Sequence, residues 1–176
     1  ARGNDKSVTS LNRYGRAEGA ASRHGWESAG TDDKYARWIN AKTGTSTDGT
    51  DDCRNEMNGM GYIVELDPYD KSKVVRKRSA LGRFAHEAAA FSRLVSGKPL
   101  AVYQGDDARN EYIYKYVSNA NWSPADATAT DRLAIGDKYL NDGKLYVAKF
   151  NADGTGQWIE LNISNSAIAN YATYKF

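Results

Sequence analysis

From Gly61 onward, turn-forming residues divide the chain into short apolar segments at a spacing of roughly 10–15 residues. The segment GYIVELDP ends at the turn pair Asp67-Pro68. Two further pairs of segments read as hairpins, AAAFSRLV with PLAVYQGDD and GKLYVAKF with QWIELN, because each pair is joined by a short connection that contains glycine. Strands of this length, separated by turns, are typical of an all-β sandwich, barrel or propeller. The sequence therefore predicts an all-β fold, with DRLAIGDKYL as a short helical insertion.

The segment NEYIYKYVSN is apolar on both faces of the strand that it predicts. Tyr112, Tyr114 and Tyr116 alternate with Ile113, Lys115 and Val117, and alternate residues of a strand point to opposite faces of a sheet. We therefore expect packing above and below the sheet, with the tyrosines in packing contacts. Stacked propeller blades provide such packing, although no internal repeat of fixed period is present.

Residues 1–60 contain few core-forming side chains, and the run from Thr43 to Asp52 has no aliphatic residue. This composition predicts long loops, with one short helix around Asp32 to Asn40. The domain prediction is a loop-rich insertion over residues 1–60 and a strand region over residues 61–176.

The charge balance and the cysteine count exclude several classes of protein. The chain has 176 residues, with 24 basic and 22 acidic side chains, which is too balanced to favour nucleic acid as a partner. No segment approaches the ~20 apolar residues that span a bilayer. Cys53 is the single cysteine, so an internal disulfide and any zinc site with two thiolates are excluded. Because the chain opens on ARGNDKSV without a leader, we expect a mature secreted chain or a piece of a longer one.

Asp106, Asp107 and Arg109 follow the predicted strand PLAVYQG and form one candidate site. Carboxylates at a strand end can bind a cation, and an arginine beside them can bind phosphate. The alternative is a turn in which Asp106 bonds its own backbone and Asp107 pairs with Arg109. The basic run from Lys73 to Arg78 is interpreted as a solvated edge strand, and NADGTG as a hairpin turn.

Three ordered blocks of the sequence resemble the PhoX-type bacterial alkaline phosphatases. The blocks are GYIVELDPYDKSKVVRKRSALGRFAHEAAAF, VYQGDDARNEYIYKYVS and LNDGKLYVAKFNADGTGQWIEL, within a resemblance that runs from about Leu11 to Leu161. The resemblance implies a six-bladed β-propeller that is periplasmic or extracellular and hydrolyses phosphate monoesters with a cluster of iron and calcium ions at the propeller axis. This chain would supply about one to two blades, and the remaining blades would belong to a longer chain.

By this resemblance, Glu87 of the pair His86-Glu87 is a metal ligand. Calcium and ferric ions prefer carboxylate oxygen, and a polycarboxylate site draws its ligands from several strands. The alternative for Glu87 is an ion pair with Arg83 or Arg78. His86 is a possible metal or phosphate contact, and its alternative is a packing role.

The sequence also departs from the family pattern. Members are much longer, with a Cys-Glu-Glu stretch before this region and an Arg-Pro-Glu motif after it, and both are missing here. Cys53 stands in the different context DDCRNEMNG, and Ala88 stands where the family usually has glycine. We therefore expect an incomplete active site in this chain. The alternative function is a secreted β-rich module that binds calcium or glycan without catalysis.

Overall fold

The computed structural model describes residues 60–108 and 110–169. Residues Gly61–Asn165 form one compact unit. The other unit consists of Ala1–Met60 and Ser166–Phe176, of which the short helix α3 (Ser166–Ala169) is described. The predicted helix around Asp32 and the surroundings of Cys53 lie outside the described residues.

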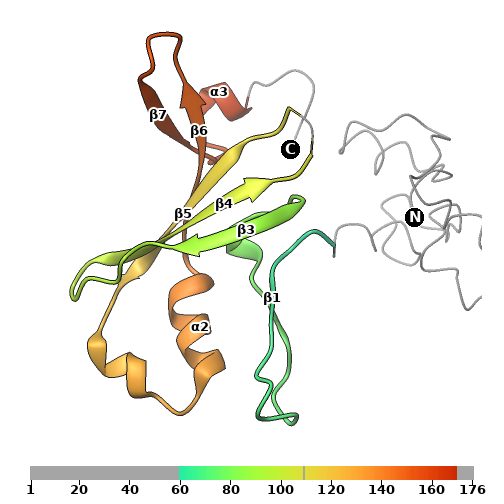
Figure 1. Ribbon diagram of the computed structural model, residues 1–176, viewed down its shortest axis with the longest axis vertical. Coiled ribbons are helices and arrows are strands. Elements are labelled where there is room, and N and C mark those ends of the chain that lie inside the picture. Colours follow the sequence, from blue (N-terminus) through green and yellow to red (C-terminus); the bar gives the residue numbers. More distant parts are fainter. Residues whose placement is uncertain (1–59, 109, 170–176) are drawn as a thin grey trace, which may run out of the picture. The chain divides into compact units, whose positions relative to one another are not determined.

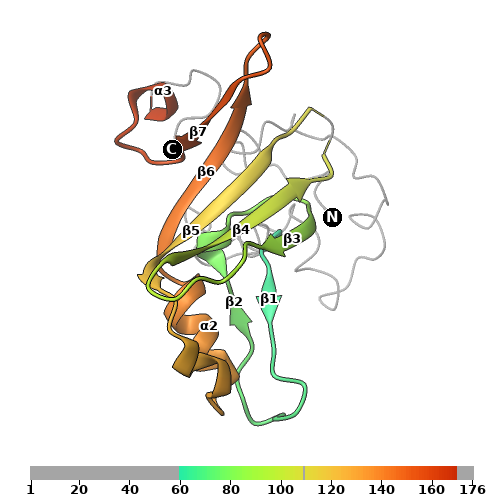
Figure 2. The same cartoon turned by 60° about the vertical axis from the view of Figure 1, so that its left-hand side comes forward.

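The larger unit is built on a five-stranded antiparallel sheet in which consecutive strands are neighbours (Figures 1 and 2). Its strands are β3 (His86–Phe91), β4 (Pro99–Asp106), β5 (Ile113–Asn121), β6 (Gly143–Phe150) and β7 (Gly156–Glu160). Both predicted hairpins are confirmed as β3–β4 and β6–β7. The fold of the described residues is therefore mostly β, as the turn spacing predicts.

Helix α2 (Arg132–Leu140) lies between β5 and β6 in the chain, after the short 3₁₀ helix η5 (Pro124–Thr128). Its first turn is capped by Asp131, whose Oδ1 accepts a hydrogen bond from the backbone N of Ala134 at 3.2 Å. The predicted helix over DRLAIGDKYL is confirmed, with Asp131 as its N-cap.

The core lies between the sheet and α2, together with the 3₁₀ helix η4 (Ser79–Leu81). Its buried side chains are contributed by η4, β4, β5 and α2: Leu81, Leu100, Val102, Tyr116 and Tyr139. Tyr116 donates its hydroxyl hydrogen to the backbone O of Tyr139 at 3.0 Å, so the polar group of this fully buried ring has a partner. The prediction that the tyrosines of this strand serve packing is confirmed for Tyr116.

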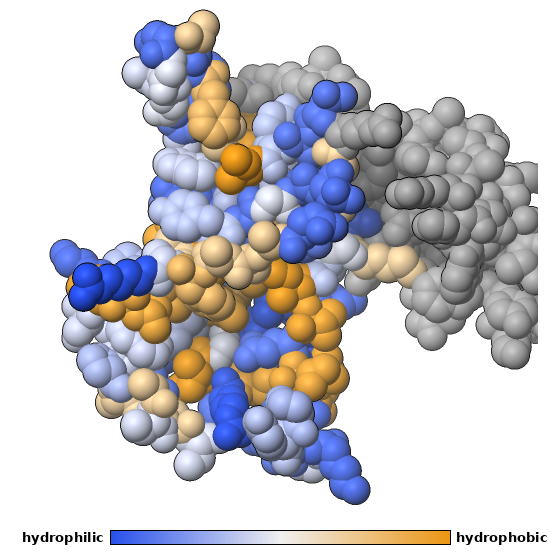
Figure 3. Space-filling view, in the orientation of Figure 1, coloured by the Kyte–Doolittle hydropathy of each residue, from blue (hydrophilic) through white to orange (hydrophobic). Residues whose placement is uncertain are grey.

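The segment from Gly61 to Arg78 forms much less strand than the sequence predicts. Only two residues on each side pair, in β1 (Val64–Glu65) and β2 (Arg76–Lys77). Apolar side chains of this segment, such as Val64 and Val74, remain more than half exposed. Figure 3 shows hydrophobic residues over β1 and β3. This apolar segment therefore forms a ladder of only two residue pairs. Two of its residues, Glu65 and Arg78, take part in a network of ion pairs instead.

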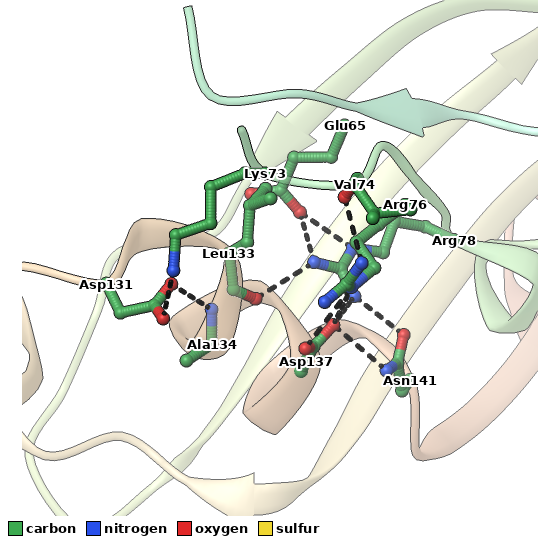
Figure 4. A network of polar contacts seen from close by, with 10 residues as sticks. All are labelled: Glu65, Lys73, Val74, Arg76, Arg78, Asp131, Leu133, Ala134, Asp137 and Asn141. Atoms are coloured by element: carbon green, nitrogen blue, oxygen red, sulfur yellow. Dashed lines mark hydrogen bonds and ion pairs between the residues drawn. The ribbon is translucent and has the colours of Figure 1, made fainter. Parts of the chain in front are cut away.

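Arg78 is the centre of that network, and its side chain is fully buried (Figure 4). The guanidinium donates from Nε to Oε2 of Glu65 at 2.7 Å and from Nη1 to Oδ1 of Asp137 at 2.6 Å. Further donations reach Oδ1 of Asn141 at 2.8 Å and the backbone O of Leu133 at 3.2 Å. The interpretation of this basic run as a solvated edge strand is wrong for Arg78. Its charge is instead matched by two carboxylates and a helix carbonyl, which joins η4, β1 and α2.

Gly136 is the residue of α2 that leaves room for this guanidinium. A Cβ at position 136 would overlap Nη2 of Arg78 and Oε2 of Glu65. We predict that Gly136→Ala lowers the free energy of unfolding by about 1–3 kcal/mol, because the overlap must be relieved in a buried site. An ordinary helical glycine shows the opposite sign, since alanine is the better helix former by about 1 kcal/mol. Chemical denaturation measures the change as a shift of the midpoint at constant slope.

Gly105→Ala is the matched control, because a Cβ there meets nothing within 4 Å and the backbone is not left-handed. Its free energy of unfolding should stay within about 0.5 kcal/mol of the unchanged protein. Equal effects of the two substitutions would contradict the packing argument.

Acid should weaken the same network through Asp137. Hydrogen bonding by Arg78 holds the pKa of Asp137 below its ordinary value. A carboxyl whose folded pKa is lowered contributes stability above the unfolded pKa of about 4, and this contribution is lost as the pH falls through the folded pKa. We predict that the difference in stability between the unchanged protein and Asp137→Asn shrinks below about pH 4. Urea unfolding at stepped pH measures it, and parallel pH profiles would contradict the assignment.

Candidate functional site

The sequence-predicted site residues gather where β3 begins and β4 ends, at one end of the sheet (Figure 1). His86 and Asp106 are directly opposite each other in the β3–β4 ladder. Asp107 continues the connection, since its backbone N donates to the O of Ala85 at 3.0 Å. The structure therefore brings His86, Glu87, Asp106 and Asp107 to one place, whereas Arg109 lies outside the described residues.

Glu87 is the extra residue of a β-bulge. His86 pairs with Asp106 and Ala88 pairs with Gly105, so two steps along β3 match one step along β4. A bulge changes the direction of a side chain and is frequent beside functional sites. The side chain of Glu87 is exposed and makes no hydrogen bond or ion pair with the residues that the structure describes. Its alternative partner Arg78 binds Glu65 and Asp137 instead.

His86 is fixed by contacts within the turn that precedes β3. Its Nε2 lies 3.2 Å from the backbone O of Gly82, and its ring centroid lies 3.7 Å from that of Phe84. If Nε2 carries the hydrogen and donates to this carbonyl, Nδ1 is left as an acceptor. Nδ1 is buried and has no hydrogen-bond partner within the described part of the chain. These contacts give His86 a packing role and hold the backbone on one side of Glu87.

Gln104 provides a second anchor for the same turn. Its side chain is buried, and Nε2 donates to the O of Leu81 at 3.0 Å. Leu81 and Gly82 are consecutive residues, so one carbonyl is held from β4 and the next from β3. This pair of contacts fixes the backbone that leads into the bulge.

Asp106 and Asp107 differ in their surroundings. Oδ1 of Asp106 accepts a hydrogen bond from the backbone N of Ala108 at 3.0 Å. This is the local contact that the alternative interpretation of Asp106, as a turn residue, predicts. Asp107 is exposed. Within the described residues, the carboxylate of Asp106 therefore accepts a hydrogen bond, whereas the carboxylate of Asp107 accepts none.

Three aromatic rings pack together at this end of the sheet, on the face that also carries Tyr116 and the core. Phe84 lies with its centroid 4.2 Å from that of Tyr114, in a stacked arrangement, and Tyr112 meets Tyr114 edge-on at 6.4 Å. Burial, followed by the charges of Glu111 and Asp106, raises the pKa of Tyr114 to about 12. The sequence did not predict the part played by Phe84, because its contact with Tyr114 depends on the turn and not on strand alternation.

Comparisons with known proteins assign the chain to a family. The family model described as alkaline phosphatase PhoX matches residues 7–175. The chain belongs to this family. A solved structure, Pseudomonas fluorescens PhoX in complex with vanadate, a transition state analogue, is 41% identical and has a TM-score of 0.51. The match covers 61% of this chain and 19% of that chain. No similar protein is found among the curated ones.

The donor atoms of the PhoX-family chain suit a metal ion only in part. The exposed carboxylates of Glu87 and Asp107 are hard oxygen donors of the kind that calcium takes. Within residues 60–108 and 110–169, however, no three His, Cys, Asp or Glu side chains lie close enough together to hold a metal ion. A complete metal site would therefore need ligands from outside these residues.

The aromatic stack gives a test of the geometry at this end of the sheet. We predict that Phe84→Ala lowers the pKa of Tyr114 from about 12 toward the ordinary value of about 10, because removing the stacked ring exposes the phenol. The pKa of Tyr116, also raised to about 12 by burial, should not change, since Tyr116 lies in the core against α2. Near-ultraviolet absorbance titration, with Tyr114→Phe for assignment, measures both. An unchanged Tyr114 titration would contradict the stack.

Proposed function

We propose that this chain is part of a metal-dependent alkaline phosphatase that hydrolyses phosphate monoesters, with an active site completed by further polypeptide. The observation that carries the proposal is the PhoX family match over residues 7–175. The identity of 41% to a PhoX protein whose structure holds a transition state analogue supports it. The match covers 19% of that solved chain, so the activity is assigned to the longer protein.

In this proposal, the five-stranded sheet is one blade of a β-propeller. A blade is a four-stranded antiparallel sheet whose consecutive strands are neighbours, and β3 to β7 have this up-and-down order with one strand more. Residues 61–176 would form the blade region and residues 1–60 a loop-rich insertion. By family likeness, we place the intact protein in the periplasm or outside the cell. No helix in the described part of the chain is long and apolar enough to cross a membrane.

The proposed role of Glu87 is to hold a metal ion, calcium in the first place, with iron as the second metal that the family likeness implies. A phosphate monoester carries two negative charges, and bound cations stabilise the charge of the transition state and activate an oxygen nucleophile. The bulge supports this role, since it leaves the Glu87 carboxylate exposed while His86 and Asp106 are tied into the sheet. Asp107 and Arg109 are proposed as secondary contacts to metal or phosphate.

A segment-swap chimera tests the proposal. The part of Pseudomonas fluorescens PhoX that matches this chain is replaced by this chain, and hydrolysis of p-nitrophenyl phosphate is measured with calcium and iron added. We predict turnover by the chimera, inhibition by vanadate, and a fall in kcat/KM of about a hundredfold or more in Glu87→Gln, because the amide is a poorer ligand than the carboxylate. The isolated chain of 176 residues should show no turnover.

Glu160→Gln is the matched control, since Glu160 lies at the end of β7 and pairs with Lys144 at 3.3 Å. Its kcat/KM should stay within about twofold of the unchanged chimera. An inactive chimera that folds would contradict the assigned activity. An active chimera that is indifferent to Glu87→Gln would contradict only the role of Glu87. Turnover by the isolated chain would contradict the incomplete site.

A further inference from the structure

Three tyrosines on one face of β5 lead from the core to the end of the sheet that carries Glu87. Tyr112, Tyr114 and Tyr116 are alternate residues, and alternate residues of an extended chain point to the same side. Tyr116 is fully buried in the core, Tyr114 is half-buried, and Tyr112 is 53% exposed. The face of the sheet that α2 and η4 cover therefore opens at this end, and an aromatic ring lies at the opening.

Tyr112 lies beside the candidate site, where β4 ends and β5 begins (Figure 1). The β4–β5 ladder ends at the pair Gly105 and Ile113. The next residues along the two strands are Asp106 and Tyr112, and Asp106 also pairs with the start of β3. Neighbouring strands are about 5 Å apart, so roughly 10 Å of sheet separates the backbone of Tyr112 from that of Glu87. This span leaves room for a metal ion and a phosphate between the Glu87 carboxylate and the Tyr112 ring.

The ring of Tyr112 is supported by other aromatic rings. It meets Tyr114 edge-on, with 6.4 Å between the ring centroids, and Tyr114 is stacked on Phe84 at 4.2 Å. The centroid of Phe84 in turn lies 3.7 Å from that of His86. A tyrosine held in this way loses little conformational entropy when it binds a ligand, because it has few rotatable bonds and its neighbours already restrict them. Its exposed part is thus a preformed surface for a second aromatic ring.

We propose that Tyr112 determines substrate specificity by binding the aromatic leaving group of a phosphate monoester, so that the longer protein prefers aryl esters to alkyl esters. This inference rests on the proposed function, since the phosphate has to be held at the metal ion that Glu87 binds. Two aromatic rings attract each other in offset or edge-on contact at about 4.5–7 Å between centroids, in addition to the effect of the area that they bury. An alkyl group offers only the buried area. The ring of Tyr112, and not its hydroxyl group, carries the contact.

A matched pair of phosphonates tests this contact in the chimera described above. Phenylphosphonate and methylphosphonate contain a phosphorus–carbon bond, so both can occupy a phosphate site without being hydrolysed, and their comparison does not depend on leaving-group chemistry. Both are measured as competitive inhibitors of p-nitrophenyl phosphate hydrolysis. We predict that phenylphosphonate binds about tenfold more tightly than methylphosphonate, and that this preference falls to about twofold or less in Tyr112→Ala.

Two further variants show whether the effect belongs to the ring of Tyr112. Tyr112→Phe should keep the preference, because the ring remains. Tyr69→Ala is the matched control, since Tyr69 is 83% exposed in the turn between β1 and β2 and its ring centroid lies 5.0 Å from Cζ of Arg132 on α2. It should leave the preference unchanged. A preference that survives in Tyr112→Ala, or that is lost equally in Tyr69→Ala, would overturn the proposal while leaving the proposed activity in place.

Saturation-transfer NMR gives a readout that needs no turnover. With calcium added, saturation of the folded chimera should pass to the ring protons of phenylphosphonate, and below the dissociation constant the signal should fall about tenfold in Tyr112→Ala. A chimera without turnover would contradict the proposed activity, and this comparison would still decide the role of Tyr112. Equal signals in the two proteins, or no signal in either, would overturn the proposal.

A smaller swap covers the case of a chimera that does not fold. Replacing only the part of Pseudomonas fluorescens PhoX that matches residues 84–116 transfers Tyr112, Glu87 and the supporting rings together. The same phosphonate pair and the same variants apply, and the same preference is expected. A folded protein of this kind that binds both phosphonates equally would overturn the proposal.

Discussion

The buried guanidinium of Arg78 is the interaction on which the arrangement of the larger unit depends. It joins helix α2, through Asp137, to the short β1–β2 ladder, through Glu65 and through its own backbone N, which donates to the O of Ile63 at 2.9 Å. A buried charge is tolerable only when its hydrogen bonds are made, so each piece fixes the others. The guanidinium and the Glu65 carboxylate lie against Gly136 of α2, where a Cβ would overlap both groups.

A second set of contacts fixes the backbone beside the candidate site. The chain passes from Arg78 through η4 into a turn whose consecutive carbonyls, those of Leu81 and Gly82, are held by Gln104 and His86. The bulge at Glu87 follows at once. A carboxylate on a flexible loop would be a poor ligand, because ordering it on binding costs conformational entropy. At Glu87 the backbone on both sides belongs to the β3–β4 ladder, and within the described residues no hydrogen bond or ion pair engages the exposed carboxylate.

The two faces of the five-stranded sheet differ in how far their side chains are buried. The face with Tyr116 receives α2 and η4 and provides the core of the compact unit. The opposite face also carries apolar side chains, but Tyr103, Ile113 and Trp158 on it remain exposed, and Nζ of Lys115 lies 4.5 Å from the ring centroid of Trp158. A sequence with apolar residues on both faces of a strand is thus consistent with a unit that contributes to a larger assembly, which agrees with its membership of a family whose solved member is much longer.

The sequence by itself determined the strands of the sheet, both hairpins, the short helix over DRLAIGDKYL and the family. These features depend on local patterns, such as glycine in a short connection between two apolar segments, together with three ordered blocks of residues. Tertiary structure alone decided the burial of Arg78, the bulge at Glu87 and the stacking of Phe84 on Tyr114. Each of these depends on residues distant in the chain: the partners of Arg78 lie 13 and 59 positions away. Side-chain alternation carries no information about such partners, so Arg78, which belongs to a basic run interpreted as solvated, is instead buried at the centre of the network.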